Sequence, residues 1–599
     1  MAKKTNNPQR NQATTTAIST ENLSNNFPWL WVLGLLLLTA IIYSPIFQNT
    51  FTNWDDEQYV TKSPMMQAVA KGNWSSIFTN PVASNYHPLT MLSLAINYKI
   101  GGLNPFGYQL INVVFHLLNT FLIFVFFWNF TNKKTTSALT IAALFALHPM
   151  HVESVAWISE RKDVLYTFFF LLGMINYWKY LTLDVKNYFY YALIFFVLSL
   201  LSKPAAIIFP LVMLLLDYYK GRPFGKNMLL EKIPFFLLSF GFAVLTLQIQ
   251  SKTAIADVNK FSLVERFFFA CYGVSDYAIK VILPFGLSAL HPFPKGLSTV
   301  HYASVLGVLT LGGLLFWQKN NKNIVFGILF YLVNLLLVLQ VVAIGNAVVA
   351  ERYTYVSYLG LFFIIAYFID NQNNTIASIF KYGSIAAIVA FSFLTFNQIK
   401  TWKNSETLWT KAIESYPTSS VALSNRALVY YNAGQHQKAI DDVNISLQNE
   451  PEHLKSLQFR ALALIGLKQY DAALKDAANF VSLAPENADA YMARGTAYSG
   501  LLQDDLAVAD YDKTAQLSPN MTEVYNNRGT LLFNRKKDYQ RALSDFDKAL
   551  SLDPKRVTAM LNRSYCHFFL GNKTKALADA NAAISLGAKP TAAYMEGLK

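Results

Sequence analysis

Long apolar runs, separated by short polar segments, make up the first two thirds of the chain. About 20 apolar residues in helical form are enough to cross the hydrocarbon core of a bilayer. On this pattern we predict eleven membrane spans. They cover residues 28–47, 107–128, 138–158, 164–181, 187–202, 205–219, 233–249, 302–317, 324–344, 354–370 and 382–398. A further apolar stretch, 266–283, is predicted to be re-entrant or to lie in the membrane interface.

The last third of the chain repeats a polar pattern with a fixed period. Five arginines lie 34, 34, 34 and 35 residues apart, and an aspartate follows each of them after 16 or 17 residues. The pairs are Arg426/Asp442, Arg460/Asp476, Arg494/Asp510, Arg528/Asp545 and Arg563/Asp579. Prolines 417, 451, 485, 519 and 554 keep the same step and are expected to close each second helix. This period matches the tetratricopeptide repeat, a helix pair that stacks on copies of itself.

We predict five such repeats over residues 420–588, with a preceding helix at 404–416 that caps the stack. Each Arg/Asp pair is interpreted as an ion pair between the two helices of its repeat, with ligand binding as the alternative. Asn425, Asn527 and Asn562 each stand one residue before an arginine. They are predicted to donate hydrogen bonds to a peptide in the concave groove, or else to face solvent.

Together these patterns predict an all-α protein in three parts. Residues 1–26 form a polar, disordered cytoplasmic tail, and residues 27–400 form a polytopic helical bundle in the membrane with an external loop at 48–106. Residues 401–599 form a superhelix of tetratricopeptide repeats.

The charge distribution excludes a nucleic-acid partner and sets the orientation in the bilayer. The net charge is +14, but the Lys and Arg residues are scattered over short loops between apolar runs. Basic loops mark the cytoplasmic side of a membrane protein. The tail, Lys133–Lys134, the segment 220–232 and the turn with Lys319 and Lys322 then face the cytoplasm, and the repeats lie outside it. If 266–283 spans the membrane instead, the second half inverts and the repeats become cytoplasmic.

An acidic triplet, Asp55, Asp56 and Glu57, follows the first span. Three adjacent carboxylates next to a bilayer repel one another and are costly to desolvate, so we expect one of them to have a raised pKa. Such a group could act as a general base towards a hydroxyl, or the triplet could hold a divalent cation. The alternative is an ordinary solvated loop.

Two more external segments carry candidate chemistry. His148, His151 and Glu153 could bind a metal from one helical turn, but we favour hydrogen bonds to the wall of a buried cavity. Arg161 and Lys162, at the head of a span, are either snorkelling cations or a grip for phosphate. Polar and ionisable residues at membrane depth also single out the segment 345–353, in which we expect Glu351 to position Arg352.

Several motifs, in this order along the chain, resemble one family. They are Trp54-Asp-Asp-Glu-Gln-Tyr59, Tyr86-His-Pro-Leu-Thr90, Gly101-Gly-Leu-Asn-Pro-Phe-Gly107, His148-Pro-Met-His-Val-Glu153, Glu160-Arg-Lys-Asp163, Leu201-Ser-Lys-Pro204 and Ala350-Glu-Arg-Tyr353. With the repeats, they resemble the transmembrane and tetratricopeptide-repeat O-mannosyltransferase-like proteins. The resemblance implies a membrane body of the C-type glycosyltransferase fold, a polyprenyl-phosphate sugar as donor, and Asp55 and Asp56 as catalytic acids. His87 stands where some relatives have arginine; we expect it to contribute to substrate binding, with the phosphate role of that position left open.

We therefore expect a membrane glycosyltransferase that moves a sugar from a polyprenyl-phosphate carrier to a hydroxyl, on Ser or Thr of a protein held by the repeats. In this interpretation Asp55 deprotonates the acceptor, and Arg161, Lys162 and Arg352 neutralise the leaving phosphate. A non-catalytic membrane scaffold for envelope assembly is the rival hypothesis. A third is an enzyme of the same fold that acts on a lipid or polysaccharide.

Overall fold

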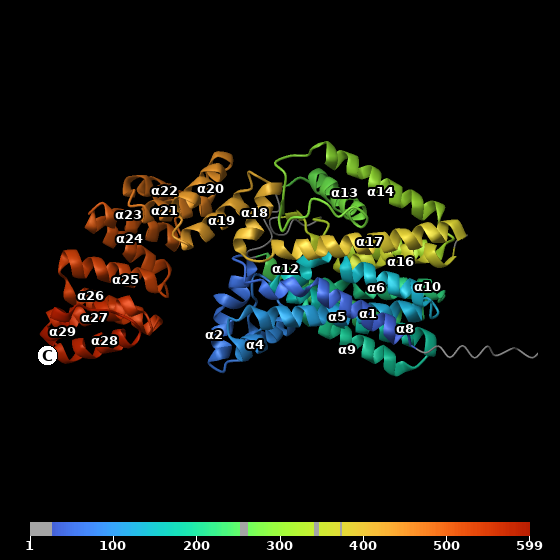
Figure 1. Ribbon diagram of the computed structural model, residues 1–599, viewed down its shortest axis with the longest axis horizontal. Coiled ribbons are helices and arrows are strands. Elements are labelled where there is room, and N and C mark those ends of the chain that lie inside the picture. Colours follow the sequence, from blue (N-terminus) through green and yellow to red (C-terminus); the bar gives the residue numbers. More distant parts are fainter. Residues whose placement is uncertain (1–26, 252–260, 341–346, 372–373, 599) are drawn as a thin grey trace, which may run out of the picture.

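The computed structural model shows an elongated, all-α molecule with two parts (Figure 1). It describes residues 27–251, 261–340, 347–371 and 374–598, so the predicted tail at 1–26 lies outside the described residues. A bundle of long helices forms one end of the molecule, and an array of helix pairs forms the other end. Within the described residues the only strands are β1 (His291–Pro292) and β2 (Ala347–Val349), which pair antiparallel.

The bundle consists of helices that correspond to the predicted spans. Six described helices are long and apolar enough to cross a bilayer, and a bent pair would be a seventh. The helices at the remaining predicted positions, α8–α10 and α15, do not meet that criterion. The bundle helices are α1 (Trp29–Ile42), α5 (Pro105–Phe130), α6 (Thr135–Leu147), α8 (Arg161–Leu183), α9 (Lys186–Ser202), α10 (Phe209–Lys220), α12 (Ile233–Gln250), α14 (Thr299–Trp317), α15 (Lys322–Leu335), α16 (Thr354–Asn371) and α17 (Asn374–Thr401). A short helix, α11 (Lys226–Leu230), precedes α12.

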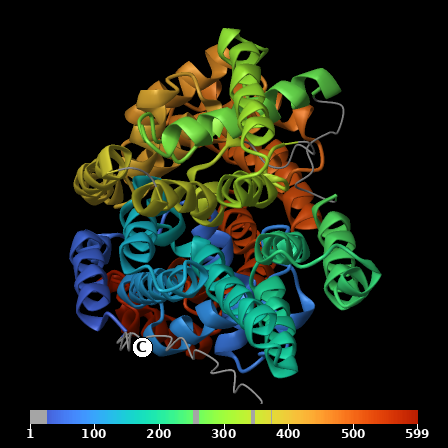
Figure 2. The same cartoon turned by 90° about the vertical axis from the view of Figure 1, so that its right-hand side faces the viewer.

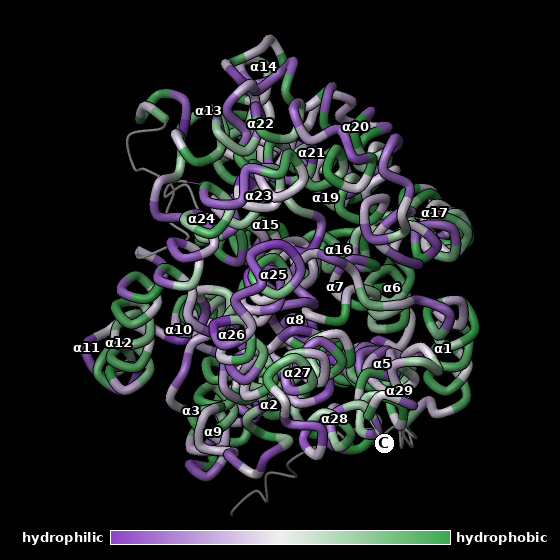
Figure 3. Tube along the Cα trace, turned by 90° about the vertical axis from the view of Figure 1, so that its left-hand side faces the viewer, coloured by the Kyte–Doolittle hydropathy of each residue, from purple (hydrophilic) through white to green (hydrophobic). Residues whose placement is uncertain are grey.

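The outer helices of the bundle expose large apolar side chains, whose contact with water is unfavourable. Leu30 of α1, Phe240 of α12 and Trp317 of α14 are all more than two-thirds exposed. Contiguous apolar surface of this kind marks contact with a membrane or partner. Figure 2 views the bundle from the end away from the array, and in Figure 3 α1 and α12 carry long hydrophobic stretches at the edges of the molecule. The chain is a multi-pass membrane protein.

The predicted span 138–158 is broken next to Pro149. Helix α6 ends at Leu147, and a short turn (Pro149–His151) and helix α7 (Val152–Ala156) continue at an angle of 55°. Proline has no backbone N–H to continue the helical hydrogen bonds, which explains the break. After the bend, Trp157 packs against Trp402, which shortly precedes the array, with ring centroids 5.3 Å apart.

The external loop folds into short elements that pack on the end of the bundle nearest to the array. They are a π-turn (Glu57–Thr61), α2 (Pro64–Ala70), α3 (Ser76–Thr79) and α4 (Pro88–Gly101). Their apolar side chains form a small core of their own with Tyr59, Met66 and Leu94, against Ile158. The hydroxyl of Thr90 donates to the carbonyl of Ser202, 2.8 Å away, and fixes α4 to the end of α9.

Helix α13 (Leu263–Lys280) has both ends on the side of the array. Near its start the ring of Phe261 packs 4.7 Å from Phe293, and just after its end the carbonyl of Val281 accepts a hydrogen bond from His148. A capping box of Ser262 and Glu265 begins the helix.

The array contains five helix pairs at the predicted repeat positions. After α18 (Ser405–Ser415) the pairs are α19 (Ser420–Asn432) with α20 (His436–Asn449), α21 (Leu454–Gly466) with α22 (Tyr470–Leu483), α23 (Ala488–Gly500) with α24 (Asp504–Leu517), α25 (Thr522–Leu531) with α26 (Tyr539–Leu552), and α27 (Val557–Phe569) with α28 (Lys573–Ser585). The five predicted prolines lie two residues beyond the ends of α18, α20, α22, α24 and α26. A last helix, α29 (Ala592–Leu598), was not predicted; it packs Tyr594 against Ser564.

The Arg/Asp ladder ties the two helices of every repeat together, as predicted. In each pair the Nε and Nη2 atoms of the arginine donate to the two carboxylate oxygens of the aspartate, with distances of 2.6–2.9 Å. Planar, bidentate pairs of this kind are among the strongest side-chain interactions. The carboxylates are nearly buried, so the ladder is structural.

The fourth repeat absorbs one extra residue locally. Its arginine and aspartate are 17 residues apart instead of 16, and a π-helical turn at Leu532–Lys536 follows α25. Lys537 closes the turn at φ 56°, a left-handed conformation. A π-turn takes up one residue without changing the faces that flank it, so Arg528 still reaches Asp545.

The ladder makes a direct prediction for an inner repeat. Arg494→Ala leaves Asp510, which is 6% exposed, without its partner. We expect it to lower local stability by about 1–3 kcal/mol, the cost of an unsatisfied buried charged group. The double change Arg494→Ala/Asp510→Ala should cost less than the sum of the two single changes. Native-state hydrogen exchange of α23 and α24 in the solubilised protein measures all four variants, and strict additivity would contradict a structural pair.

Candidate functional site

The two aspartates after the first span have different surroundings. The carboxylate of Asp56 is 1% exposed and accepts four hydrogen bonds: from the backbone N–H and hydroxyl of Thr52, at 2.8 and 3.0 Å, and from the backbone N–H (3.0 Å) and hydroxyl of Ser159. The side chain of Asp55 is 28% exposed, and its Oδ2 lies 3.7 Å from Nζ of Lys162. Asp56 therefore joins the external loop to the bundle, while Asp55 remains accessible.

Burial raises the pKa of Asp56 to about 6, although its four hydrogen bonds act in the opposite direction. The expectation that one acidic residue has a raised pKa is confirmed. Of the two expected causes, repulsion within the triplet and the removal of water, it is the removal of water that raises the pKa of Asp56. Glu57 lies outside this site, because its carboxylate pairs with Lys62, whose Nζ is 2.8 Å away.

Glu160 lies at the centre of an arc of three cations. Its carboxylate oxygens are 3.1 Å from Lys162 Nζ, 3.7 Å from Lys203 Nζ and 3.5 Å from Arg352 Nε. Burial raises the pKa of Glu160, but the three cations outweigh it and hold this pKa below its usual range. We call these four residues, with Asp55, the charged cluster.

Glu160, Asp163 and Lys203 were not among the predicted site residues. Asp163 accepts hydrogen bonds from Lys203 and from Ser154 and so fixes the lysine in the cluster. The signal was present, because all three lie in motifs of the family resemblance, Glu160-Arg-Lys-Asp163 and Leu201-Ser-Lys-Pro204.

Arg352 is positioned by Glu153, not by Glu351 as predicted. Its Nη1 and its backbone N–H donate to the two oxygens of Glu153, at 2.5 and 2.9 Å. Glu351 instead accepts hydrogen bonds from the backbone N–H of Ser288 (2.7 Å) and from His291 (3.0 Å). Adjacent residues of a tight turn point in different directions, which separates the two side chains.

Arg161 lies outside the cluster, which corrects its predicted role as a phosphate grip. It is fully buried, and its guanidinium donates to neutral groups of α4 and α5: Ser93 (2.7 Å), Asn97 (3.0 Å), Asn112 and the carbonyl of Tyr108 (2.8 Å). Neighbouring positions on a helix point about 100° apart, so only Lys162 of this basic pair reaches Asp55.

His148 and His151 are structural, as the favoured interpretation predicted. Both are completely buried, and their ring nitrogens lie 3.3 Å from the carbonyl of Val281 and 2.8 Å from that of Phe145. Within the described residues no group of three or more His, Cys, Asp and Glu side chains is arranged to hold a metal ion. The structure does not bring His148, His151 and Glu153 together as metal ligands, because both rings face backbone carbonyls and Glu153 binds Arg352.

Aromatic rings form the floor of the cluster. Trp157 is buried between Trp54 and Trp402, with ring centroids 4.8 and 5.3 Å away, and the guanidinium of Arg352 lies 5.6 Å from its centroid. His87 stacks on Tyr59 at 5.2 Å, and burial lowers the pKa of His87 to about 3. The neutral His87 ring cannot supply the positive charge of an arginine.

Two of the three predicted groove asparagines have structural roles. Asn425 is 5% exposed, and its side chain donates to the carbonyl of Val421 at 2.8 Å. Asn562 donates to the hydroxyl of Thr530 at 3.2 Å and so links two repeats. Asn527 is half-buried beside Asn526, and its groove role stays a prediction.

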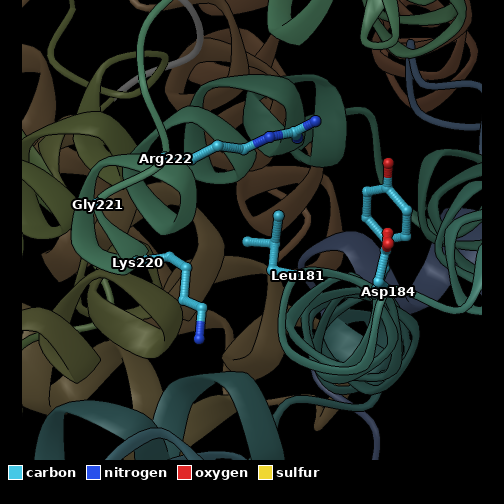
Figure 4. A pocket seen from close by; sticks show the side chains of 6 residues that line it. Leu181, Asp184, Lys220, Gly221 and Arg222 are labelled. Atoms are coloured by element: carbon cyan, nitrogen blue, oxygen red, sulfur yellow. The ribbon is translucent and has the colours of Figure 1, made fainter. Parts of the chain in front are cut away.

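A pocket of about 320 Å³ lies at the far end of the bundle (Figure 4). It is lined by Tyr180, Leu181, Asp184, Lys220, Gly221 and Arg222. The cluster contains the first turn of α8, and the pocket adjoins the last turn of the same 23-residue helix. At 1.5 Å per residue the two are about 30 Å apart, so this pocket belongs to a different surface.

Two family models match the array of helix pairs, which we call the repeat arm. Both describe the tetratricopeptide repeat, and they match residues 408–441 and 527–593. Among solved structures, YrrB, described as a TPR protein with an unusual peptide-binding site, is 23% identical with a TM-score of 0.25, covering 30% of this chain and 92% of its own. TTC0263 of Thermus thermophilus is 16% identical with a TM-score of 0.26, covering 30% of this chain and 95% of its own.

The similar curated proteins are named protein O-mannosyl-transferases. Human TMTC1 is 22% identical over 483 residues, which are 69% of this chain and 54% of TMTC1. Human TMTC4 is 29% identical over 177 residues (26% and 24% of the two chains), and human TMTC2 is 33% identical over 126 residues (21% and 15%). The chain thus spans about half the length of TMTC1. These matches confirm the resemblance that the motifs indicated: the chain is similar to the TMTC proteins and has tetratricopeptide repeats in its C-terminal third.

Proposed function

We propose that this protein is a membrane glycosyltransferase that moves a sugar from a polyprenyl-phosphate carrier to a hydroxyl, on Ser or Thr of a protein recruited by the repeat arm. The observation that carries the proposal is the charged cluster, where an accessible carboxylate, Asp55, stands beside three cations gathered around Glu160. The names of the TMTC relatives favour mannose as the first sugar to test and protein as the acceptor.

In the proposed reaction the acceptor hydroxyl attacks the anomeric carbon of the donor. Asp55 takes the hydroxyl proton as the new carbon–oxygen bond forms, and the bond from the anomeric carbon to the phosphate oxygen breaks. The phosphate leaves with the electron pair of that bond. A general base must be within reach of the hydroxyl, and of the triplet Asp55 alone is accessible beside the cations.

The three cations match the charge that develops on the leaving phosphate. The side chains of Lys162, Lys203 and Arg352 are 10%, 19% and 17% exposed, so they are largely shielded from water but not sealed from a ligand. Positive groups that are already oriented, in a site of low dielectric, stabilise such charge without reorganising. Glu160 and Asp163 keep them oriented, since each is buried and bound to one or more of these cations.

Asp56 acts through its neighbour. Two of its hydrogen bonds come from Thr52 and two from Ser159, so Asp56 holds the backbone around Asp55 against the bundle, and 1% exposure leaves no room for a substrate. We assign it as a positioning residue and reserve the proton transfer for Asp55.

The proposed reaction faces away from the cytoplasm. The lysine-bearing turns at Lys133–Lys134 and Lys319–Lys322 lie at the end of the bundle opposite to the arm, as the positive-inside rule requires for an external arm. Both ends of α13 contact segments on the side of the arm, which supports a helix that does not cross the membrane.

This orientation can be tested with reporter fusions. Alkaline phosphatase fused after Trp402 should be active, because that position would lie outside the cytoplasm. The same reporter fused after Lys134 is the control and should be silent. An inactive fusion after Trp402 would place the arm in the cytoplasm and would overturn the proposed topology.

The role of Asp55 predicts a large effect of an isosteric change. Asp55→Asn should insert normally but lower the rate of sugar transfer about 10²–10⁴-fold, the usual share of general-base catalysis. Glu57→Gln is the matched control, because Glu57 pairs with Lys62 outside the cluster, and it should transfer at nearly the normal rate. The measurement is incorporation from labelled polyprenyl-phosphate sugars into envelope proteins.

Three outcomes of that assay would contradict the proposal. Normal transfer by Asp55→Asn would remove Asp55 as the base. No transfer by the unaltered protein with any of the donors would favour the scaffold hypothesis. Label found only in lipid or polysaccharide would favour the third hypothesis.

The raised pKa of Asp56 predicts that the stability of the protein depends on pH. Its pKa is raised from 3.8 to about 6, so folding favours the neutral form and loses stability as the pH rises from about 4 through 6. Asparagine does not titrate. The stability of the unaltered protein relative to Asp56→Asn should thus fall by about 3 kcal/mol over this range and stay constant above it. Melting temperatures of both proteins at several pH values measure the difference, and a gap that does not change with pH would refute the assignment.

A further inference from the structure

The first helix of the arm, α18, contacts the loop that leads to Asp55 of the charged cluster. The backbone of the external loop runs beside the junction of α17 and α18: the N–H of Thr50 donates to the carbonyl of Lys403, and the N–H of Asn53 donates to the hydroxyl of Ser405, both at 2.8 Å. These contacts fasten the residues just before Asp55 to the arm.

The side chain of Asn53 has both of its polar atoms bound by the arm. Its Oδ1 accepts a hydrogen bond from Nε1 of Trp409 at 2.6 Å, and its Nδ2 donates to the carbonyl of Asn425 at 2.8 Å. Trp409 belongs to α18 and is completely buried, and Asn425 belongs to α19. A buried tryptophan with a satisfied N–H is a rigid anchor, since both its position and its orientation are fixed.

The residue between Asn53 and Asp55 is held in the same way. The ring of Trp54 lies 4.8 Å from Trp157 of the bundle and 4.9 Å from Trp409 of the arm. Asp55 is thus flanked on one side by two residues held by the arm, and on the other by Asp56, which is held by Ser159 of the bundle.

The other end of α18 is connected to the turn that carries Arg352. The hydroxyl of Tyr416, which follows α18, lies 2.7 Å from Nδ1 of His291, and Nε2 of the same ring lies 3.0 Å from Glu351. Glu351 directly precedes Arg352. Helix α18 is therefore connected through Trp409 to the loop that carries Asp55. Through Tyr416, just beyond its end, it is connected to the turn that carries Arg352.

We propose that α18 is a positioning element of the catalytic centre, and that Trp409, through Asn53, sets the orientation of Asp55 towards the cations. The arm then contributes to the chemical step itself and not only to the capture of the acceptor. This inference rests on the proposed glycosyltransferase function for its kinetic consequence, but the ordering of the loop by α18 can be measured without any reaction.

The chain offers a matched pair of substitutions. Trp409→Phe keeps an aromatic ring in the stack but removes the hydrogen bond to Asn53. Trp402→Phe makes the same change in a buried ring of the same stack, and among the described residues the Nε1 of Trp402 has no hydrogen-bond partner to lose. Asn53→Ala removes the same contact from the other side without altering a buried ring, in case Trp409→Phe fails to fold.

The first readout is hydrogen exchange of the backbone amides at 51–57 in the full-length protein. We expect Trp409→Phe and Asn53→Ala to raise the exchange rate about fivefold or more, the factor that corresponds to one net hydrogen bond. Trp402→Phe should leave the rate within about twofold of the unaltered protein. Equal exchange in Trp409→Phe and Trp402→Phe would overturn the inference, whether or not any transfer activity is found.

The second readout is the kinetics of transfer to a protein acceptor. If α18 positions Asp55, kcat should fall about tenfold or more in Trp409→Phe and Asn53→Ala while KM for the acceptor changes little, because misplacing a catalytic group by about 1 Å can cost ~10²-fold. A rise in KM with unchanged kcat would mean that α18 serves acceptor capture alone and would contradict the inference. Absence of transfer by the unaltered protein would defeat the proposed function, and hydrogen exchange would still decide the role of α18.

Discussion

The charged cluster depends on keeping an ionised carboxylate buried at the edge of a bilayer. Removing a single charge from water costs several kcal/mol, and Glu160 is 1% exposed. Three cations from three different elements compensate it: Lys162 from the start of α8, Lys203 from the end of α9, and Arg352 from the turn before α16. The requirement works in both directions, because without Glu160 the cations would repel one another. The positions of the three elements are therefore coupled through one side chain.

The repeat arm was the part most open to prediction from sequence. Its architecture repeats at a fixed interval, and each Arg/Asp pair connects neighbouring helices, so spacing alone identified the partners. The bundle was harder, because lipid-facing and buried helices are both apolar. Hydropathy could not distinguish α12, which is exposed along its length, from α9, which is short and packed beside α8.

The candidate site could be predicted only in outline. The motifs named the right segments, but not which side chain of each segment faces the cluster: Arg161 turns into the core while Lys162 reaches Asp55. The partner of Arg352 is Glu153, 199 residues away, rather than the adjacent Glu351. The contact between Asn53 and Trp409 joins residues 356 apart. Such pairings follow from tertiary packing, and no local pattern in one sequence encodes them.

The π-turn of the fourth repeat has a consequence for how such an arm changes during evolution. An inserted residue would normally rotate everything that follows it by about 100°. Here the turn at Leu532–Lys536 takes up the insertion, and the next rung, Arg563 with Asp579, forms as in the other repeats. The rungs of the ladder, not the lengths of the helices, thus keep the two helices of each repeat in phase. A repeat of this kind can therefore carry one extra residue near the end of its first helix and still form part of a continuous superhelix.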